Sequence, residues 1–311
     1  MINHIVTAEF DYTVRDFAKT WAREISRRFQ TIHTHLLAGV VKLPAGAYLF
    51  TDMERQAGLQ RELQAQIYDQ LAAAGDSVRL LNHPTRSLMR FDLLTMLYEK
   101  GINPYRCFRG FEIPSDLRFP AFVRQENDHH GSRTPLLHSW SDLEEAFIRL
   151  SLQGIPTEQM LTVEFCDVSQ DGLYVKYAAQ RIGDRVINRH VLPSTDWIVK
   201  GTNTNNPEFV QREIEYVHAN PHEEALRQIF DLANIQFGRL DYSFFGSKIV
   251  VWEINTNPSF FTEGSEKFEV RLPVHIHFAE RAKEAFLEID VPDDGTRIPI
   301  ELHLKPFQRQ P

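Results

Sequence analysis

The sequence predicts a mixed α/β fold from two features: short apolar runs that alternate with a helix near the N-terminus, and paired strand patterns further along. Residues 47–50 and 78–81 are short apolar runs typical of buried strands. The segment 54–74 between them has a helical composition and ends before Gly75, a common helix stop. This strand–helix–strand order predicts a parallel sheet. We also expect a helix over 16–37, where apolar residues recur every three or four positions.

Strand pairs dominate the C-terminal half of the prediction. Residues 174–182 and 185–191 flank Gly183-Asp184, which is a hairpin pattern. Residues 240–245 and 249–254 form a second pair, so we expect a mostly antiparallel sheet there. The remaining expected elements are helices at 88–100, 141–153 (capped by Ser141), 222–233 and 279–289, and strands at 121–124 and 160–165.

Four segments follow from this order of elements. Residues 1–86 form an N-terminal α/β domain, and residues 87–166 form a small central subdomain. Residues 167–290 form a larger C-terminal subdomain. Residues 291–311, which are rich in proline, form a tail that we expect to lie extended against the surface.

Bulk properties narrow the classes of function. The formal net charge of −8 gives no basic face for nucleic acid or for an anionic membrane. No apolar stretch has the length of a membrane span, and the N-terminus lacks the pattern of a secretory signal. Two cysteines without a C-x-x-C pair indicate reduced structural thiols. We therefore expect a cytoplasmic protein that binds neither nucleic acid nor membrane.

Carboxylates inside apolar strands mark the candidate site. Asp241 lies within the strand at 240–245, and Glu253 lies within the strand at 249–254. A buried charge needs a partner or a metal ion. Asn255 lies two residues beyond Glu253 and therefore faces the same side of its strand. Arg239 stands in the same relation to Asp241.

The turn between the two strands decides whether these groups meet. A three-residue turn, Gly246-Ser247-Lys248, would place Asp241 opposite Glu253 and Arg239 opposite Asn255. A two-residue turn would place Asp241 opposite Trp252 instead, because a slip of one residue reverses the faces. We therefore predict an odd-length turn or a bulge.

Two carboxylates and an amide oxygen are hard ligands that suit Mg²⁺ or Mn²⁺. Asp241, Glu253 and Asn255 are thus candidate metal ligands, and the Arg239 guanidinium beside them is suited to bind a transferring phosphoryl group. On spacing alone, a buried ion-pair cluster of Arg239 with the two carboxylates explains the same pattern.

The string GRLDYSFFGSKIVVWEINTNPS resembles the metal-binding hairpin of ATP-grasp enzymes, with Arg-x-Asp, a turn, and then Glu-x-Asn-x-x-Pro. Weaker similarity extends over roughly residues 80–260. The types it resembles are D-alanine–D-alanine ligase, glutathione synthetase and the ribosomal-protein glutamate ligase. The resemblance implies an ATP-grasp fold in which an α/β domain precedes two subdomains that enclose ATP.

The resemblance also implies roles for individual residues. Arg239 would be catalytic by stabilising the acyl phosphate, and Asp241, Glu253 and Asn255 would hold Mg²⁺ or Mn²⁺. The residues implied to contact ATP are Arg90, Arg124 and Lys200 at the phosphates, Glu164, Phe165 and Cys166 at adenine, and Asp171 at the ribose.

Two differences from the family pattern stand out. Arginine replaces the usual lysine at Arg90 and at Arg124, and the loop 125–131 is acidic and contains histidines instead of being rich in glycine. The pair His129-His130 fits either a functional site or a solvated loop. The basic residues Arg181, Arg185, Arg189 and His190 fit either an anion site or a solvated face. His275 and His277 fit either metal ligands or ordinary packing.

The resemblance implies an ATP-dependent ligase that joins small-molecule carboxylate and amine substrates and releases ADP. A kinase or phosphotransferase with the same metal site is the first alternative, and an ATP-binding protein without catalysis is the second. A homodimer is compatible with the resemblance, since dimers are common among similar enzymes.

Overall fold

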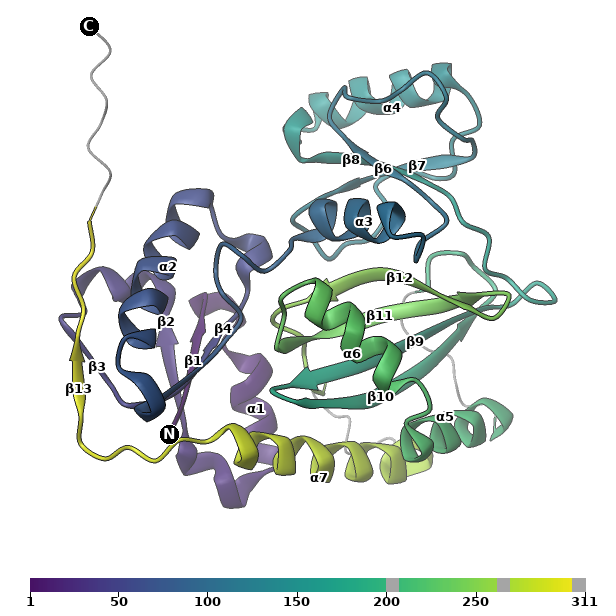
Figure 1. Ribbon diagram of the computed structural model, residues 1–311. Helices are drawn as coiled ribbons and strands as arrows, with labels where there is room; N and C mark the ends of the chain where they lie inside the picture. The colour runs from purple at the N-terminus through teal and green to yellow at the C-terminus, as the bar shows by residue number, and fades with distance from the viewer. Residues whose placement is uncertain (200–206, 262–268, 304–311) are drawn as a thin grey trace, which may run out of the picture.

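The computed structural model describes residues 1–199, 207–261 and 269–303. Figure 1 shows three parts: an N-terminal α/β unit at the left, a small sheet under helix α4 at the top, and a larger sheet below them. The predicted mixed α/β class is confirmed.

The N-terminal unit is a parallel sheet with helices on both faces. Its strands stand in the order β2-β1-β4-β5 and all pair in parallel. Ile67 of helix α2 packs beside Phe50 on one face, and Phe17 of helix α1 packs beside Leu49 on the other. The elements are β1 (Ile2–Val6), α1 (Tyr12–Thr20), β2 (Phe29–His33), β4 (Gly46–Phe50), α2 (Gly58–Ala72) and β5 (Val78–Leu81).

The expectation of one long helix over 16–37 is wrong. Helix α1 ends at Thr20, and two short 3-10 turns, Arg23–Arg28 and Thr34–Gly39, flank strand β2. Strand β2 pairs in parallel with β1, which the sequence analysis did not anticipate. Residues 29–33 form a strand despite their helix-like spacing, because the edge of the sheet offers their backbone a continuous set of hydrogen-bond partners.

The small sheet belongs to the central part of the chain and stands in the order β6-β8-β7. Helix α4 covers it with Leu143, Phe147 and Leu150. Its N-cap is Ser139, whose side chain accepts a hydrogen bond from the Asp142 amide at 3.1 Å, so the expected cap at Ser141 is wrong by two residues. The elements are β6 (Cys107–Arg109), β7 (Ala121–Gln125), α4 (Trp140–Leu152) and β8 (Met160–Glu164).

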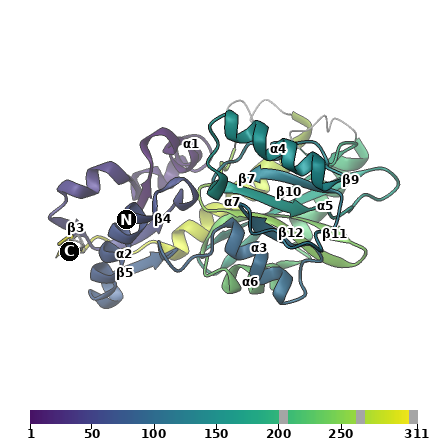
Figure 2. The ribbon, with the colours of Figure 1, turned by 90° about the horizontal axis from the view of Figure 1, so that it is seen from above.

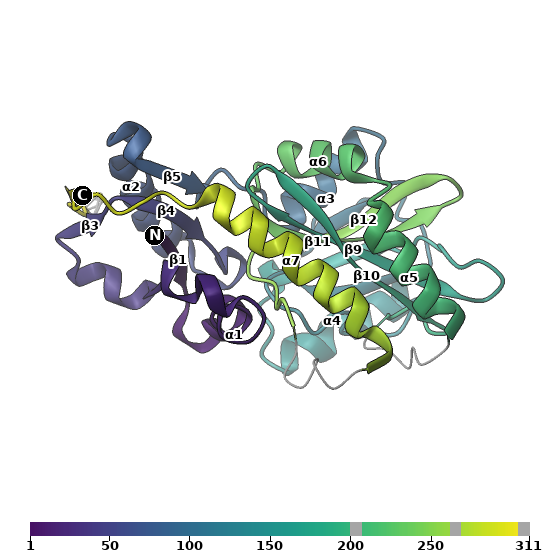
Figure 3. The same cartoon turned by 90° about the horizontal axis from the view of Figure 1, so that it is seen from below.

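The large sheet is antiparallel, as predicted, with the order β10-β9-β11-β12. Helix α3 packs on strand β12, and α7 runs under the sheet from the N-terminal unit to α5 (Figure 3). Helix α7 begins seven residues earlier than the expected start at 279. The elements are α3 (Arg90–Glu99), β9 (Tyr174–Ile182), β10 (Arg185–Ser194), α5 (Pro207–Ala219), α6 (Glu223–Leu232), β11 (Phe237–Phe245), β12 (Lys248–Asn255) and α7 (Leu272–Ile289).

Two segments join parts that are distant in sequence. Phe278 and Phe286 of α7 share one apolar cluster with Phe17 and Ile2, so α7 packs against both the N-terminal unit and the large sheet. Strand β13 (Arg297–Pro299) pairs with β3 (Lys42–Pro44), which returns the tail to the first unit (Figure 2). In the described part of the chain, no helix combines the length and apolarity needed to cross a membrane.

Asn82 connects the N-terminal sheet to the large sheet. Its side-chain amide donates to the carbonyls of Phe50 and Phe237 at 3.1 and 2.7 Å. Its side-chain oxygen accepts from the amides of Gln236 and Phe237 at 2.8 and 2.9 Å. The backbone of Asn82 is left-handed, with a φ of 64°, a region that asparagine tolerates better than most residues.

We predict that Asn82→Ala lowers the free energy of unfolding by about 2–4 kcal/mol, because it leaves four buried backbone groups unpaired and strains the left-handed backbone. Urea denaturation measures this loss. Asn82→Gly is the matched comparison, since it relieves the backbone strain but not the lost hydrogen bonds. Equal stability of wild type and Asn82→Ala would contradict the assignment.

Candidate functional site

A bulge in strand β12 aligns the candidate residues. The turn holds two residues, Gly246-Ser247, and Phe245 pairs with Lys248. The register shifts between Tyr242↔Val251 and Asp241↔Glu253, which leaves Trp252 as the extra residue. The expected three-residue turn is therefore wrong, and the alternative of a bulge is correct. As predicted, Asp241 lies opposite Glu253.

Neighbouring residues hold the bulge in place. The Asn103 side chain donates to the Val251 carbonyl and accepts from the Val251 amide, both at 2.9 Å. The Tyr105 hydroxyl donates to the same carbonyl at 2.6 Å. At the far end of the hairpin, a Cβ on Gly238 would lie 2.9 Å from the Asn255 carbonyl oxygen, so glycine permits the close approach of the two strands.

Asp241 is buried between two cations. Its carboxylate accepts from Arg239 Nε at 2.8 Å and from Lys176 Nζ at 3.1 Å. Burial lowers the pKa of the Arg239 guanidinium, but the charge and hydrogen bond of Asp241 outweigh burial and raise that pKa. Lys176 was not anticipated, because only the pairing of β9 with β11 reveals that it shares a face with Asp241.

Glu253 is bound by both Arg90 and Arg124. Its Oε2 accepts from Arg90 Nη2 at 2.5 Å and from Arg124 Nη2 at 3.1 Å. Burial raises the pKa of Glu253, but these two guanidinium groups outweigh it and hold the pKa well below its ordinary value. Burial, with Arg90 as a second cause, lowers the pKa of Arg124 to about 10.

A cavity of about 190 Å³ lies over this face of the sheet. One end is aromatic and apolar, where the Trp197 ring lies 5.0 Å from Phe122 and 5.7 Å from Phe165 between centroids. The other end is charged and includes Arg124, Lys176, Asp241 and Glu253. One cavity thus offers an apolar wall and a wall of mixed charge to the same ligand.

The carboxylates fit a hard divalent cation by donor type, because they offer oxygens on one face beside a cavity. Asn255 pairs with Arg239 across the strands. Its side-chain oxygen accepts from the Asn257 amide at 2.9 Å, and an amide oxygen has a second lone pair. Within the described ranges, no group of three or more His, Cys, Asp or Glu side chains could hold a metal. A set of three protein ligands at this site therefore needs the Asn255 side chain.

The structure places some expected nucleotide contacts in the cavity and others outside it. Phe165 and Cys166 line it, whereas Lys200 lies outside the described residues. Glu164 does not line the cavity: its carboxylate is 2% exposed and is bound by Arg106 and Arg118. Asp171 is exposed in the turn between Gln170 and Leu173 and does not line the cavity.

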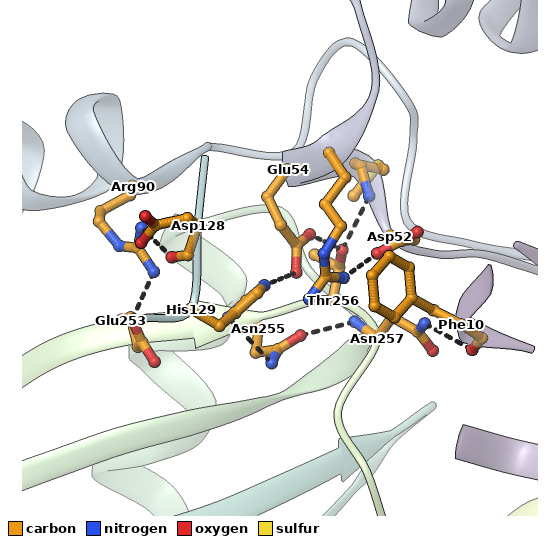
Figure 4. A network of polar contacts seen from close by, with 12 residues as sticks. Phe10, Asp52, Glu54, Arg90, Asp128, His129, Glu253, Asn255, Thr256 and Asn257 are labelled. Carbon is orange, nitrogen blue, oxygen red and sulfur yellow. Dashed lines mark hydrogen bonds and ion pairs between the residues drawn. The ribbon is translucent and has the colours of Figure 1, made fainter. Parts of the chain in front are cut away.

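Glu54 and His129 contact the hairpin from outside the large sheet (Figure 4). His129 Nε2 lies 3.3 Å from Glu54 Oε1, an ion-pair distance without the alignment of a hydrogen bond. The His129 Nδ1 atom lies 3.5 Å from the side-chain nitrogen Nδ2 of Asn255. The reading of His129 as a solvated loop residue is therefore wrong. Glu54 was not anticipated, since nothing in its local sequence distinguishes it from other surface acids.

The basic hairpin is a solvated face only in part, since Arg185 pairs with Glu288 at the surface. Arg181 is buried and bonds to Asp231, and Arg189 is buried, donates to the Phe260 carbonyl and lies near the rings of Phe261 and Phe278. His190 lies in the same sheet row as Asp241, through Ala178. Burial, then the nearby arginines and lysine, hold its pKa well below the ordinary value.

The spacing of His275 and His277 does not bring them together, because both lie on α7, where residues two apart face different sides. The His275 ring packs against Trp21 and Phe261. The His277 ring lies 3.9 Å from the ring of His218 between centroids. Both cysteines are free and buried, and burial raises the pKa of each thiol to about 11.

No protein-family model matches the sequence, and no curated protein matches it. Solved structures with similar folds do exist. The ATP-grasp ligase PsnB complexed with a minimal precursor aligns with a TM-score of 0.54 at 12% identity, over 91% of this chain and 98% of that chain. PsnB complexed with a phosphomimetic variant of the minimal precursor, Mg and ADP aligns with a TM-score of 0.52 at 13% identity, over 92% and 96%.

D-alanine–D-alanine ligase from Bacillus anthracis, complexed with ATP, aligns with a TM-score of 0.49 at 9% identity, over 91% of this chain and 99% of that chain.

The ion pairs of Glu164 with Arg106 and Arg118 give a pH prediction. Burial raises its pKa, but the bonds from Arg118 and Arg106 outweigh burial and lower the pKa from 4.5 to about 2. A carboxylate with a depressed pKa stabilises the fold above its unfolded pKa and loses that stabilisation as the pH falls toward 2. Glu164→Gln should therefore lower the free energy of unfolding by about 1–3 kcal/mol at pH 7.

The difference between wild type and Glu164→Gln should shrink as the pH falls below 4.5, because protonated glutamic acid resembles glutamine. Urea denaturation from pH 7 to pH 3 measures it. A difference that stays constant over this range would contradict the ion pairs as its cause.

Proposed function

The chain has the ATP-grasp fold, and from this premise we propose that it is an ATP-dependent ligase that joins a carboxylate to an amine through an acyl phosphate. The observation that carries the proposal is the pairing of Asp241 with Glu253 on the cavity face, with cations on each carboxylate. Such a set serves phosphoryl transfer, where positioning and charge neutralisation supply most of the rate.

The two ends of the cavity suit the two ends of a nucleotide. Adenine would lie against the aromatic wall, with Trp197, Phe122 and Phe165 around it. The triphosphate would lie at the charged end, where Arg124 and Lys176 face the carboxylates. Arg90 reaches the same carboxylate as Arg124 and would contribute a third positive charge.

Asp241, Glu253 and Asn255 would hold Mg²⁺ or Mn²⁺, which would neutralise charge on the phosphate oxygens. The arginines and lysine that now bind the carboxylates would turn to the phosphates, because a phosphate attracts guanidinium and ammonium groups as strongly as a carboxylate does. The ion-pair cluster and the metal site are thus two uses of the same residues.

The chemistry of the chain's own residues follows from their positions. A carboxylate oxygen of the first substrate attacks the γ-phosphorus of ATP, and ADP leaves. Arg239, held by Asp241, would bind the acyl phosphate and the tetrahedral intermediate. The amine then attacks the acyl carbon, loses a proton to solvent, and phosphate leaves with the electrons of the broken C–O bond.

An ATP-consumption screen tests the proposal. We expect ADP and phosphate to appear with Mg²⁺ and one of a panel of amino acids and small carboxylic acids, together with an amide product found by mass spectrometry. A stable phosphorylated product would identify a phosphotransferase instead. Binding of ATP without turnover under any condition would identify a nucleotide-binding protein.

We predict that Glu253→Gln lowers ATP turnover by at least about 100-fold, the scale of losing one charge that acts on a transferring phosphoryl group. Glu164→Gln is the matched control, since Glu164 is also buried between two arginines but lies outside the cavity lining. Thermal unfolding of both variants reports their stability. Equal turnover of the two variants at a temperature where both are folded would contradict the assigned role.

A further inference from the structure

The loop that follows strand β7, residues 126–131, closes one side of the cavity, and side chains hold it there. His129 and Gly131 belong to the cavity lining. Arg90 Nη1 donates to the backbone carbonyls of Glu126 and Asp128, the latter at 3.0 Å, while its Nη2 donates to Glu253. The loop is therefore connected to helix α3 and to the hairpin through one guanidinium.

A second connection comes from the N-terminal unit. Glu54 Oε1 lies 3.3 Å from His129 Nε2 in the loop, and Glu54 Oε2 accepts a hydrogen bond from the Thr256 hydroxyl at the end of the hairpin. The Met53 amide donates to the same hydroxyl at 3.2 Å. Glu54 therefore contacts the loop with one oxygen and the hairpin with the other (Figure 4).

The position of Glu54 is rigid. It lies just beyond the carboxyl end of strand β4, in the short turn Met53–Arg55. The preceding residue, Asp52, is fully buried and bonds to Thr7 and Arg55. A group on the end of a central strand is well placed to hold a neighbouring loop in position.

A bound nucleotide would affect the Arg90 contacts and the contact between Glu54 and His129 differently. The Arg90 contact uses a cation that faces Glu253 and would turn to phosphate oxygens. The contact between Glu54 and His129 involves none of the cations that are proposed to bind phosphate, so it can remain when a nucleotide binds.

We propose that Glu54 and His129 are positioning residues that close the loop 126–131 over the bound phosphates and keep Asn255 in place, which ties closure to the N-terminal unit. This inference rests on the proposed function only for the identity of the ligand. The contact itself is a property of the free protein.

Hydrogen exchange tests the proposal. Glu54→Gln keeps an acceptor for Thr256 but removes the charge facing His129, and His129→Ala removes the ring. Both should speed the exchange of amides 126–132 by about 5- to 30-fold, the effect of losing one partly buried polar contact, in the free protein and again when a non-hydrolysable ATP analogue is bound. The double variant should be no worse than His129→Ala alone, because Glu54 acts on the loop only through the His129 ring.

Glu62→Gln and His138→Gln are the matched controls, since both residues are exposed and lie in the same two parts of the chain. Loop exchange equal to that of the controls would overturn the proposal. Faster exchange spread evenly over strands β1 and β4 would also overturn it, because it would mean a general loss of stability. Failure of wild type to bind nucleotide would count against the proposed function, while loop exchange in the free protein would still decide the role of the contact.

Discussion

The burial of Glu253 is the constraint on which the arrangement of this molecule depends. A carboxylate with 18% of its side chain exposed needs positive partners, and the chain supplies one from helix α3 and one from the small sheet. Those partners bring three parts of the chain to one point. The same charges that stabilise the folded protein are also the charges that a triphosphate would need, so stability and the proposed binding compete for one set of residues.

The bulge at Trp252 places Glu253 on the same face of the sheet as Asp241. Without the extra residue, the two-residue turn would place Asp241 opposite Trp252, and the carboxylates would face different sides. The side chain of Asn103 and the hydroxyl of Tyr105 bond to the backbone of Val251, next to the bulge. Both belong to the connection between α3 and β6, so the segment that follows the helix carrying Arg90 also fixes the register that positions Glu253.

Local patterns predicted most of the fold and the centre of the site. The strands around Gly183 and around Gly246 were predicted from alternation and turn residues. Counting residues along the two strands showed that Asp241 and Glu253 share a face only with an odd-length turn or a bulge. The strand at Phe29–His33 was missed because its spacing also suits a helix and only its pairing with β1 decides between them. A turn length cannot be read from three turn-forming residues, so the choice between a longer turn and a bulge stayed open.

The residues that surround the two carboxylates were harder to predict, because their positions depend on contacts between segments that are distant in the sequence. Lys176 joins Asp241 through strand pairing, and Glu54 joins His129 through the packing of the N-terminal unit against the loop. The resemblance placed Glu164 near adenine, whereas in the structure Arg106 and Arg118 bind its carboxylate. One sequence gives no information about which arginine will meet which acid.

The most direct test of the central claim is a crystal structure with a non-hydrolysable ATP analogue and Mg²⁺. We expect the contacts of Arg90 and Arg124 with Glu253 to be broken, both arginines to bind phosphate oxygens, and Asp241 and Glu253 to ligate the metal. A nucleotide bound elsewhere, or bound with both arginines still on Glu253, would contradict it.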